Sequence, residues 1–178
     1  MHIFAISGSL RASSTTTTLL RAIVALAPTN VEIGIYDGLD DLPHFSPDRD
    51  GDDAPTSVRT LREQLRAADG VLICTPEYAY GMPGSLKNAL DWTVSSGEFS
   101  FKPTAAVSAS PHAAGGERAL ASLLLTLRAE GARVAEGATL SVPFVRKKMD
   151  EAGAIVDPET KQAVRGVLDA LARDIQGQ

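Results

Sequence analysis

Five short apolar runs alternate with five helical patterns along the 178 residues of the chain. The runs lie at residues 2–7, 31–36, 70–75, 102–108 and 132–142. The first run is apolar almost throughout, which is typical of a strand in a parallel sheet that is covered on both faces. Strands that alternate with helices build sheets of this kind. The sequence therefore predicts an α/β fold with a five-stranded parallel sheet and helices on both faces.

Each helical pattern carries an apolar stripe that we expect to face this sheet. The third pattern begins near Pro83, which suits a first helical turn, and its stripe consists of Leu86, Ala89, Leu90 and Val94. Because we find no internal repeat, low-complexity tract or linker, we predict a single domain over residues 1–178.

Composition and charge exclude several classes of protein. No window approaches the roughly 18 apolar residues that span a bilayer, and the N-terminus lacks the basic region and cleavage site of a signal peptide. The net charge of -5 argues against a general nucleic-acid binder. The single cysteine, Cys74, lies in an apolar run, so we expect an inert buried thiol and no disulfide framework. We therefore expect a soluble cytoplasmic protein with no membrane or nucleic-acid partner.

An aspartate-rich loop spans residues 37–55 and contains seven aspartates. Its spacing does not match a calcium-binding loop, because glycine stands at the fourth position counted from Asp48 instead of the sixth, and Arg59 stands in place of the bidentate glutamate. No cluster of His, Cys, Asp or Glu has the spacing of a metal site. We expect a solvated loop without a metal, which can rim a site elsewhere.

Ligands of open α/β sheets bind beyond the carboxyl ends of the strands, where the strand order reverses. In the order 2-1-3-4-5 this reversal falls between the first and third strands. The loops after these two strands are the most unusual in the sequence, and the loop after the fourth strand is their next neighbour. We therefore predict one site where the three loops meet. His44 and His112 lie in loops and are candidates to border the ligand.

The loop after the first strand has the composition of a phosphate site. It leads into a helix, whose N-terminal N–H groups and dipole attract anions. Hydroxyl groups and one arginine add donors: Ser9, Arg11, Ser14, Thr16 and Thr17. A helix cap rich in Ser and Thr has the same composition, so both interpretations stay open. The motifs G-x-x-x-x-G-K-[ST] and G-x-G-x-x-G are absent, which disfavours an ATPase and a dinucleotide-binding Rossmann domain.

The loop after the third strand, residues 75–84, contains two prolines, two glycines and two tyrosines. This composition suits a rigid strand-to-helix connection, but turned-out backbone and aromatic faces also suit a planar heterocycle. A phosphate site beside a flat slot fits FMN, whose flavin carries the redox chemistry itself. We therefore expect no catalytic acid or base from the protein.

Two motifs of the chain resemble those of the NADPH-dependent FMN reductase family, which has a flavodoxin-like fold and includes quinone, chromate and azo-dye reductases. The first motif is GSLRASS at residues 8–14, and the second is TPEYAYGMPGSLKNALDW at residues 75–92. The resemblance extends over residues 1 to about 142. It implies a flavodoxin-like three-layer sandwich with the strand order 2-1-3-4-5.

The resemblance also implies how each loop binds FMN. The first loop would hold the phosphate through Ser9, Arg11, Ser14, Thr16 and Thr17. The third-strand loop would wrap the isoalloxazine and ribityl parts through Pro76, Glu77, Tyr78, Ala79, Tyr80 and Gly81. The fourth-strand loop would border the flavin through Ser110, Gly115 and Gly116. The family often has asparagine where Thr16 and Ala79 stand; Thr16 can still donate to a phosphate, whereas Ala79 offers only its backbone.

The function that the resemblance implies is an FMN-dependent NAD(P)H oxidoreductase. NADPH or NADH would reduce the bound FMN, which would pass electrons to a quinone, free flavin, azo compound or metal oxyanion. The alternative is a flavodoxin-like electron carrier or a non-catalytic FMN-binding protein, although Arg11 and residues 76–78 fit the reductases better. A homodimer or homotetramer is also implied, with Trp92 and Val94 as candidates for the interface or the core. The sequence identifies neither the acceptor nor a preference for NADPH over NADH.

Overall fold

Within residues 1–51 and 53–177, which the computed structural model describes, five parallel strands form one sheet in the order β2-β1-β3-β4-β5. Asp52 of the aspartate-rich loop and Gln178 lie outside the described residues. The strands are β1 (His2–Ser7), β2 (Glu32–Tyr36), β3 (Gly70–Thr75), β4 (Pro103–Ala109) and β5 (Arg133–Val142). The predicted parallel sheet and its strand order are confirmed.

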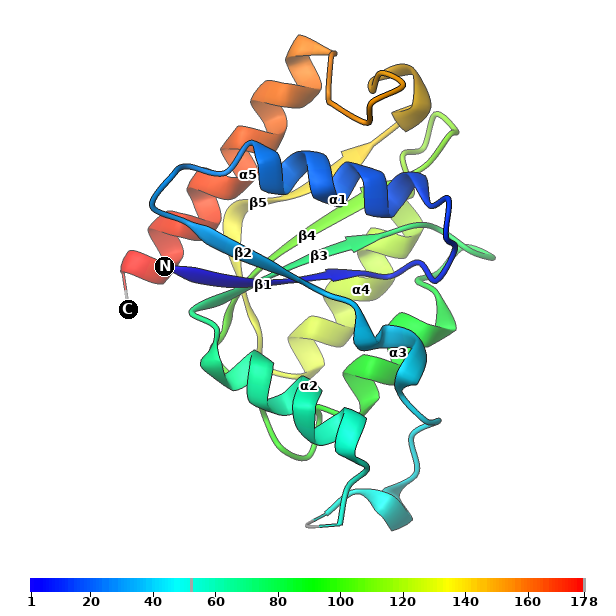
Figure 1. The fold of residues 1–178 in the computed structure, drawn as a ribbon, viewed down its shortest axis with the longest axis vertical. Helices are drawn as coiled ribbons and strands as arrows, with labels where there is room; N and C mark the ends of the chain where they lie inside the picture. Colours follow the sequence, from blue (N-terminus) through cyan, green and yellow to red (C-terminus); the bar gives the residue numbers. More distant parts are fainter. Residues whose placement is uncertain (52, 178) are drawn as a thin grey trace.

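Helices cover both faces of this sheet (Figure 1). The described α-helices are α1 (Thr15–Ala25), α2 (Thr56–Ala67), α3 (Gly84–Asp91), α4 (Glu117–Ala129) and α5 (Pro158–Gln176). Short 3-10 helices interrupt the connections at η1 (Gly38–Asp41), η2 (Pro47–Arg49) and η3 (Val145–Lys147). Helices α1 and α5 pack on one face and α2, α3 and α4 on the other, which gives the three layers of the flavodoxin-like sandwich. No helix among the described residues is long and apolar enough to cross a membrane.

The alternation of side chains along each strand divides the core between the two faces. In β1, Ile3 and Ala5 pack under α1 and α5, whereas Phe4 and Ile6 pack under the other three helices. Every residue of β3 and β4 is buried, and apolar residues predominate in both strands. Burial raises the pKa of the Cys74 thiol to about 12, so Cys74 is the inert buried thiol that we predicted.

The third helix ends earlier than its apolar stripe predicts. Helix α3 stops at Asp91, and Val94 lies beyond it with 59% of its surface exposed, so its place in the stripe was wrong. Trp92 is fully buried and its indole N–H donates to the Pro43 carbonyl at 2.8 Å, so its role is in the core.

The aspartate-rich loop exposes its described aspartates other than Asp50, as expected of a solvated loop, but it is also fastened to the protein. Leu39 and Leu42 are buried against the α2–α4 layer. The Asn88 side chain donates to the Pro43 carbonyl at 3.0 Å and accepts from the Phe45 N–H at 2.8 Å. The loop therefore lies along α3 and is held there by specific contacts.

Candidate functional site

At the carboxyl edge of the sheet, the loops after β1, β3, β4 and β5 surround a cavity of about 210 Å³. Its lining contains eight of the fourteen residues that the sequence singled out: Ser9, Arg11, Ser14, Thr16, Pro76, Glu77, Tyr78 and Ser110. The other six lining residues are Thr15, Ala109, Pro111, His112, Val145 and Arg146. Of these, the sequence suggested only His112, as a residue that borders the ligand. The three loops expected to meet at this edge do meet there.

The first wall of the cavity is the N-terminus of α1. Ser14 caps this helix, and its side-chain oxygen accepts the N–H of Thr17 at 3.2 Å. The N–H groups of Thr15 and Thr16 have no acceptor within residues 1–51 and 53–177, and both residues line the cavity. The two interpretations of this segment are therefore compatible, because Ser14 caps the helix while two N–H groups stay available to an anion.

Arg11 stands at the mouth of the same wall. Its backbone N–H donates to the Ser9 side chain at 3.4 Å, which shapes the loop, and its own side chain is exposed. No ion pair of the described residues includes Arg11. Thr17 does not line the cavity, and its hydroxyl lies 2.7 Å from the Ser7 hydroxyl instead. Arg11 is therefore the wall's available cation, while Thr17 fixes the loop to the end of β1.

The second wall is the loop after β3, which closes on itself in a tight turn. Tyr78 and Gly81 exchange two backbone hydrogen bonds of 3.0 Å, and the central residues Ala79 and Tyr80 are left-handed, with φ of 48° and 64°. Pro76, Glu77 and Tyr78 line the cavity, whereas residues 79–81 form the tip of the turn outside its lining. Tyr80 is 70% exposed, and the Arg118 guanidinium lies 4.2 Å from the centroid of its ring.

Glu77 ties this second wall to α4. One carboxylate oxygen of Glu77 accepts the backbone N–H groups of Arg118 and Ala119, both at 3.1 Å. These are N–H groups of the first turn of α4, which an acidic side chain satisfies well. The sequence suggested that Glu77 binds the cofactor, but it held no signal for this contact, because the partners lie more than 40 residues away.

The glycine pair before α4 shapes the β4 loop. Gly115 and Gly116 are buried and left-handed, with φ of 62° and 82°. A Cβ at Gly116 would lie 3.2 Å from the Cβ of Ser108, which is a tight contact, and the left-handed backbone at this position also favours glycine. Ser110, the third predicted residue of this loop, lines the cavity and accepts the His112 N–H at 3.1 Å.

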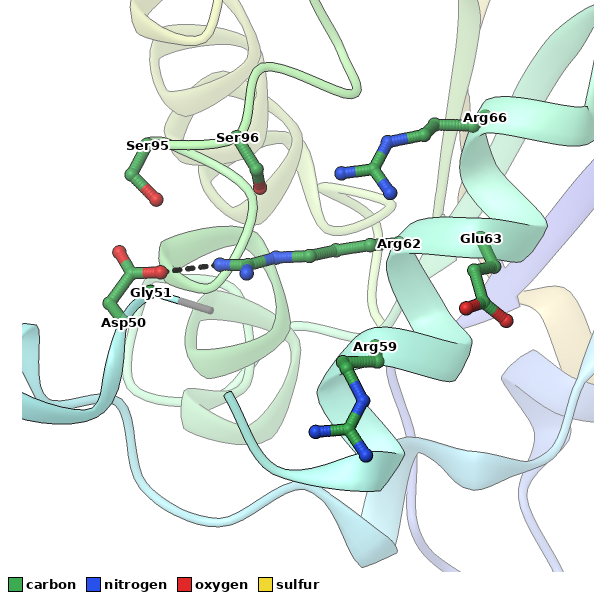
Figure 2. A pocket seen from close by; sticks show the side chains of 8 residues that line it. All are labelled: Asp50, Gly51, Arg59, Arg62, Glu63, Arg66, Ser95 and Ser96. Carbon is green, nitrogen blue, oxygen red and sulfur yellow. Dashed lines mark hydrogen bonds and ion pairs between the residues drawn. The ribbon is translucent and has the colours of Figure 1, made fainter. Parts of the chain in front are cut away.

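A larger cavity of about 460 Å³ lies on another side of the molecule, between α2 and residues 50–51 and 95–96 (Figure 2). Arg62 reaches across it to Asp50 at 2.5 Å, and both side chains are nearly buried. Burial opposes ionisation of Asp50, but hydrogen bonds from Ser95 and Arg62 and the Arg62 charge prevail and lower the pKa of Asp50.

The other two arginines of this larger cavity are also paired inside the chain. Arg66 lies 2.5 Å from Glu98, and Arg59 donates to the Ala54 carbonyl at 2.5 Å. The three arginines of this cavity are therefore engaged within the described residues, and Arg62 and Arg59 hold the aspartate-rich loop against α2. The smaller cavity at the sheet edge is therefore the candidate site.

Comparison with known proteins identifies the family of the chain. The family model for NADPH-dependent FMN reductase matches residues 1–168. The chain belongs to this family. A curated member, an NAD(P)H-dependent FMN reductase of Pseudomonas aeruginosa, is 33% identical over 173 residues, 96% of this chain and 93% of the relative. A quinone reductase of Escherichia coli K12 is 31% identical over 180 residues, 99% of this chain and 96% of the relative.

Solved structures place the fold in the same group. FerB, a flavoenzyme NAD(P)H:(acceptor) oxidoreductase from Paracoccus denitrificans, matches with a TM-score of 0.84 at 29% identity, over 99% of this chain and 97% of that one. As a member of the NADPH-dependent FMN reductase family, the chain is an FMN-dependent NAD(P)H oxidoreductase. The family, fold, enzyme class and cofactor expected from the two sequence motifs are therefore confirmed.

The donors of the cavity fit FMN on chemical grounds. Two free N–H groups, several hydroxyls and the Arg11 guanidinium can hold a phosphate, and Pro76 and Tyr78 offer flat surface beside them. The one acidic residue in the lining, Glu77, directs an oxygen to the N–H groups of α4. The assignment of individual contacts to FMN remains a prediction.

Proposed function

We propose that the chain passes electrons from NADPH or NADH, through FMN held at the 210 Å³ cavity, to a quinone or a similar small acceptor. The observation that carries this proposal is the convergence of the α1 N-terminus and residues 76–78 on that cavity. The flavin itself, when bound, accepts hydride and passes the electrons on. The quinone acceptor is suggested by the quinone reductase of Escherichia coli K12, which the chain resembles over 99% of its length.

In this proposal the protein binds FMN and orients its ring for the reaction. Ser9, Arg11, Ser14, Thr16 and the N–H of Thr15 hold the phosphate, and Thr17 supports them through Ser7. Pro76, Glu77, Tyr78 and Ser110 border the ring and ribityl chain, with the turn of Ala79, Tyr80 and Gly81 and the pair Gly115-Gly116 keeping the two loops in shape. No residue is assigned as a catalytic acid or base, because the positioning of two rings accounts for the protein's part.

The test is to load the purified protein with FMN and follow NADPH and NADH oxidation with a series of quinones, free flavin and azo dyes. We expect FMN-dependent turnover with at least one quinone, and direct two-electron reduction of the bound flavin by NADPH. Absence of turnover with every acceptor would contradict the proposal. Absence of turnover together with a stable one-electron state on reductive titration would favour the electron-carrier alternative.

We further propose that the enzyme is a homodimer or homotetramer built from a single domain over residues 1–178. Support comes from large apolar side chains that are exposed outside the cavity, including Tyr80, Val94 and Leu125, at 70%, 59% and 69% exposure. Sedimentation equilibrium of the FMN-loaded protein tests this, and a monomer at micromolar concentration would contradict it. We also propose a cytoplasmic location, since a fold whose one cysteine is a buried thiol suits a reducing compartment.

A further inference from the structure

We propose that Arg146 is a second phosphate-binding residue of the FMN site, so that Arg11 and Arg146 together neutralise the phosphate dianion. This inference rests on the proposed FMN site and adds a residue from the far end of the sheet. Arg11 belongs to the loop after β1, and Arg146 belongs to η3, which follows β5. Both line the same cavity, together with the free N–H groups of α1.

The backbone that carries Arg146 is firmly placed. The neighbouring Val145 is 1% exposed, and its N–H donates to the Ser110 carbonyl at 3.1 Å. The N–H of Phe144 donates to the His112 carbonyl at 3.3 Å. Helix η3 also contacts α1, whose first turn forms the phosphate wall. Arg146 is therefore held at the edge of the cavity by a fixed segment and not by a free surface loop.

Three consecutive bases, Arg146, Lys147 and Lys148, have three different surroundings. The Lys148 ammonium donates to the Thr160 hydroxyl at 2.9 Å and lies 3.5 Å from Asp157, so it secures the start of α5. The Lys147 ammonium lies 5.5 Å from the ring centroid of Phe144 and is not part of the cavity lining. Of the three, Arg146 alone lines the cavity, and no ion pair of the described residues includes it.

The charge of the ligand explains the need for a second cation. A phosphate monoester carries about 1.5 to 2 negative charges near neutral pH. One arginine and a helix N-terminus, equivalent to roughly half a positive charge, supply about 1.5 positive charges, which leaves up to about half a negative charge on the phosphate besides the negative charge of Glu77 in the lining. Glu77, the acidic residue of the lining, already directs an oxygen to two backbone N–H groups. A second guanidinium brings the site close to neutrality and adds a forked donor that matches phosphate oxygens.

The experiment compares FMN with riboflavin, which has the same ring and ribityl chain but no phosphate. Dissociation constants are measured by flavin fluorescence on the apoprotein of the wild type, Arg146→Ala, Arg146→Lys and Lys147→Ala. For Arg146→Ala we expect FMN binding to weaken about tenfold or more, since a charged hydrogen bond is lost, and riboflavin binding to change less than about twofold. The FMN dissociation constant of Arg146→Lys should lie between those of the wild type and Arg146→Ala, and that of Lys147→Ala should equal the wild-type value.

Three outcomes would overturn the inference. Arg146→Ala could bind FMN as tightly as the wild type, could lose FMN and riboflavin equally, or could raise the KM for NADPH without changing the FMN dissociation constant. The last result would assign Arg146 to the nicotinamide nucleotide. A wild-type protein that binds neither flavin would instead contradict the proposed function itself, so the two failures are distinguishable. Far-UV circular dichroism of each variant checks that the exposed Arg146 side chain can be removed without unfolding.

Discussion

Glu130 is a buried acid whose burial favours its protonated form. One of its oxygens has no partner among the described residues, and the other lies 2.6 Å from the Thr93 hydroxyl. The same hydroxyl lies 2.7 Å from the Leu90 carbonyl, which can only accept. Because a hydroxyl has one proton, Thr93 donates either to Glu130 or to the Leu90 carbonyl at any moment, and its hydrogen bond to Glu130 lowers the pKa of that acid by less than burial raises it. Burial is the main reason why the pKa of Glu130 is raised to about 7.

Glu130 should therefore make the fold less stable as the pH rises. Its folded pKa of about 7 lies above the ordinary value of 4.5, so between these pH values the folded state keeps a proton that the unfolded chain has lost. The free energy of unfolding falls across that window, by up to about 3 kcal/mol, and the loss is complete above pH 7. Urea unfolding at pH 5 and pH 8 measures it. Glu130→Gln has no carboxyl group to titrate, so its free energy of unfolding should fall less than that of the wild type between pH 5 and pH 8. Equal falls in both proteins would contradict this role of Glu130.

Ala79 is the residue where backbone strain and the departure from the family pattern coincide. Its φ of 48° is left-handed, a conformation that costs an ordinary side chain about 1 kcal/mol and that glycine and asparagine tolerate. The asparagine that the resemblance leads us to expect at this position would suit this conformation. We expect both Ala79→Gly and Ala79→Asn to raise the free energy of unfolding, by about 1 kcal/mol for glycine.

The control for Ala79 is the same substitution at an ordinary helical position. Ala121 is exposed within α4, where glycine costs about 1 kcal/mol relative to alanine. Ala121→Gly should therefore lower the urea midpoint while Ala79→Gly raises it. A fall at both positions would show that the turn of residues 78–81 relaxes in solution.

Among the elements, the β3 loop and α4 depend on each other through Glu77. Glu77→Ala removes an acceptor from two N–H groups of the α4 first turn, which should lower the free energy of unfolding by about 1–3 kcal/mol. FMN binding should weaken as well, because Glu77 lies between two lining residues, Pro76 and Tyr78. Glu77→Gln keeps an oxygen that can accept a hydrogen bond, so its free energy of unfolding and its FMN affinity should lie between those of the wild type and Glu77→Ala.

Urea unfolding of the apoproteins and FMN titration measure the two effects of Glu77 separately. Glu117→Gln is the matched control, because Glu117 is an exposed acid in the same helical turn that accepts no hydrogen bond among those of the described residues. It should change stability by a few tenths of a kcal/mol at most. If Glu77→Ala were no less stable than Glu117→Gln, the two hydrogen bonds would not hold the loop.

The bounds of the elements were predictable where local sequence decides them. The runs at residues 2–7 and 70–75 coincide with β1 and β3, because a parallel strand that is covered on both faces is apolar almost throughout. The end of α3 was not predictable in this way. Arg62 donates to the Trp92 carbonyl at 3.0 Å from α2, 30 residues away, and Trp92 itself bonds to Pro43. These contacts between residues far apart in the sequence accompany the end of the helix before Val94, and the pattern of apolar residues in the sequence does not reveal them.

For the whole molecule, the rule that ligands of open α/β sheets bind where the strand order reverses predicted the place of the site. The composition of the loops there predicted part of its lining. The strand order places the loops after β1 and β3 side by side, and their unusual residues then meet by necessity. The rule could not assign Arg146, because the run of bases after β5 lies far from both motifs in the sequence. Tertiary contacts of η3 with α1 and with the β4 loop bring Arg146 to the cavity. The same rule also gave no reason to expect that Glu77 accepts hydrogen bonds from α4, or that the ion pair of Asp50 with Arg62 holds the aspartate-rich loop.

A ligand that touches four loops at once should stabilise the whole fold. The cavity is lined by residues that follow β1, β3, β4 and β5, so unfolding of any of these segments removes part of the site. FMN at 100 times its dissociation constant should add about 2.7 kcal/mol to the free energy of unfolding by mass action. For a chain of 178 residues this corresponds to a rise in Tm of roughly 5–10 °C.

Differential scanning calorimetry with and without FMN measures this rise, and a single transition that moves as one unit is expected. Arg11→Ala provides the control, because it removes an exposed guanidinium from the phosphate wall and should leave the Tm of the apoprotein unchanged. At the same FMN concentration its Tm should rise less than that of the wild type, since the dissociation constant is larger. A rise that is equal in both proteins would show that the cofactor's phosphate is held elsewhere. A second transition that ignores FMN would show that part of the sheet unfolds independently of the site.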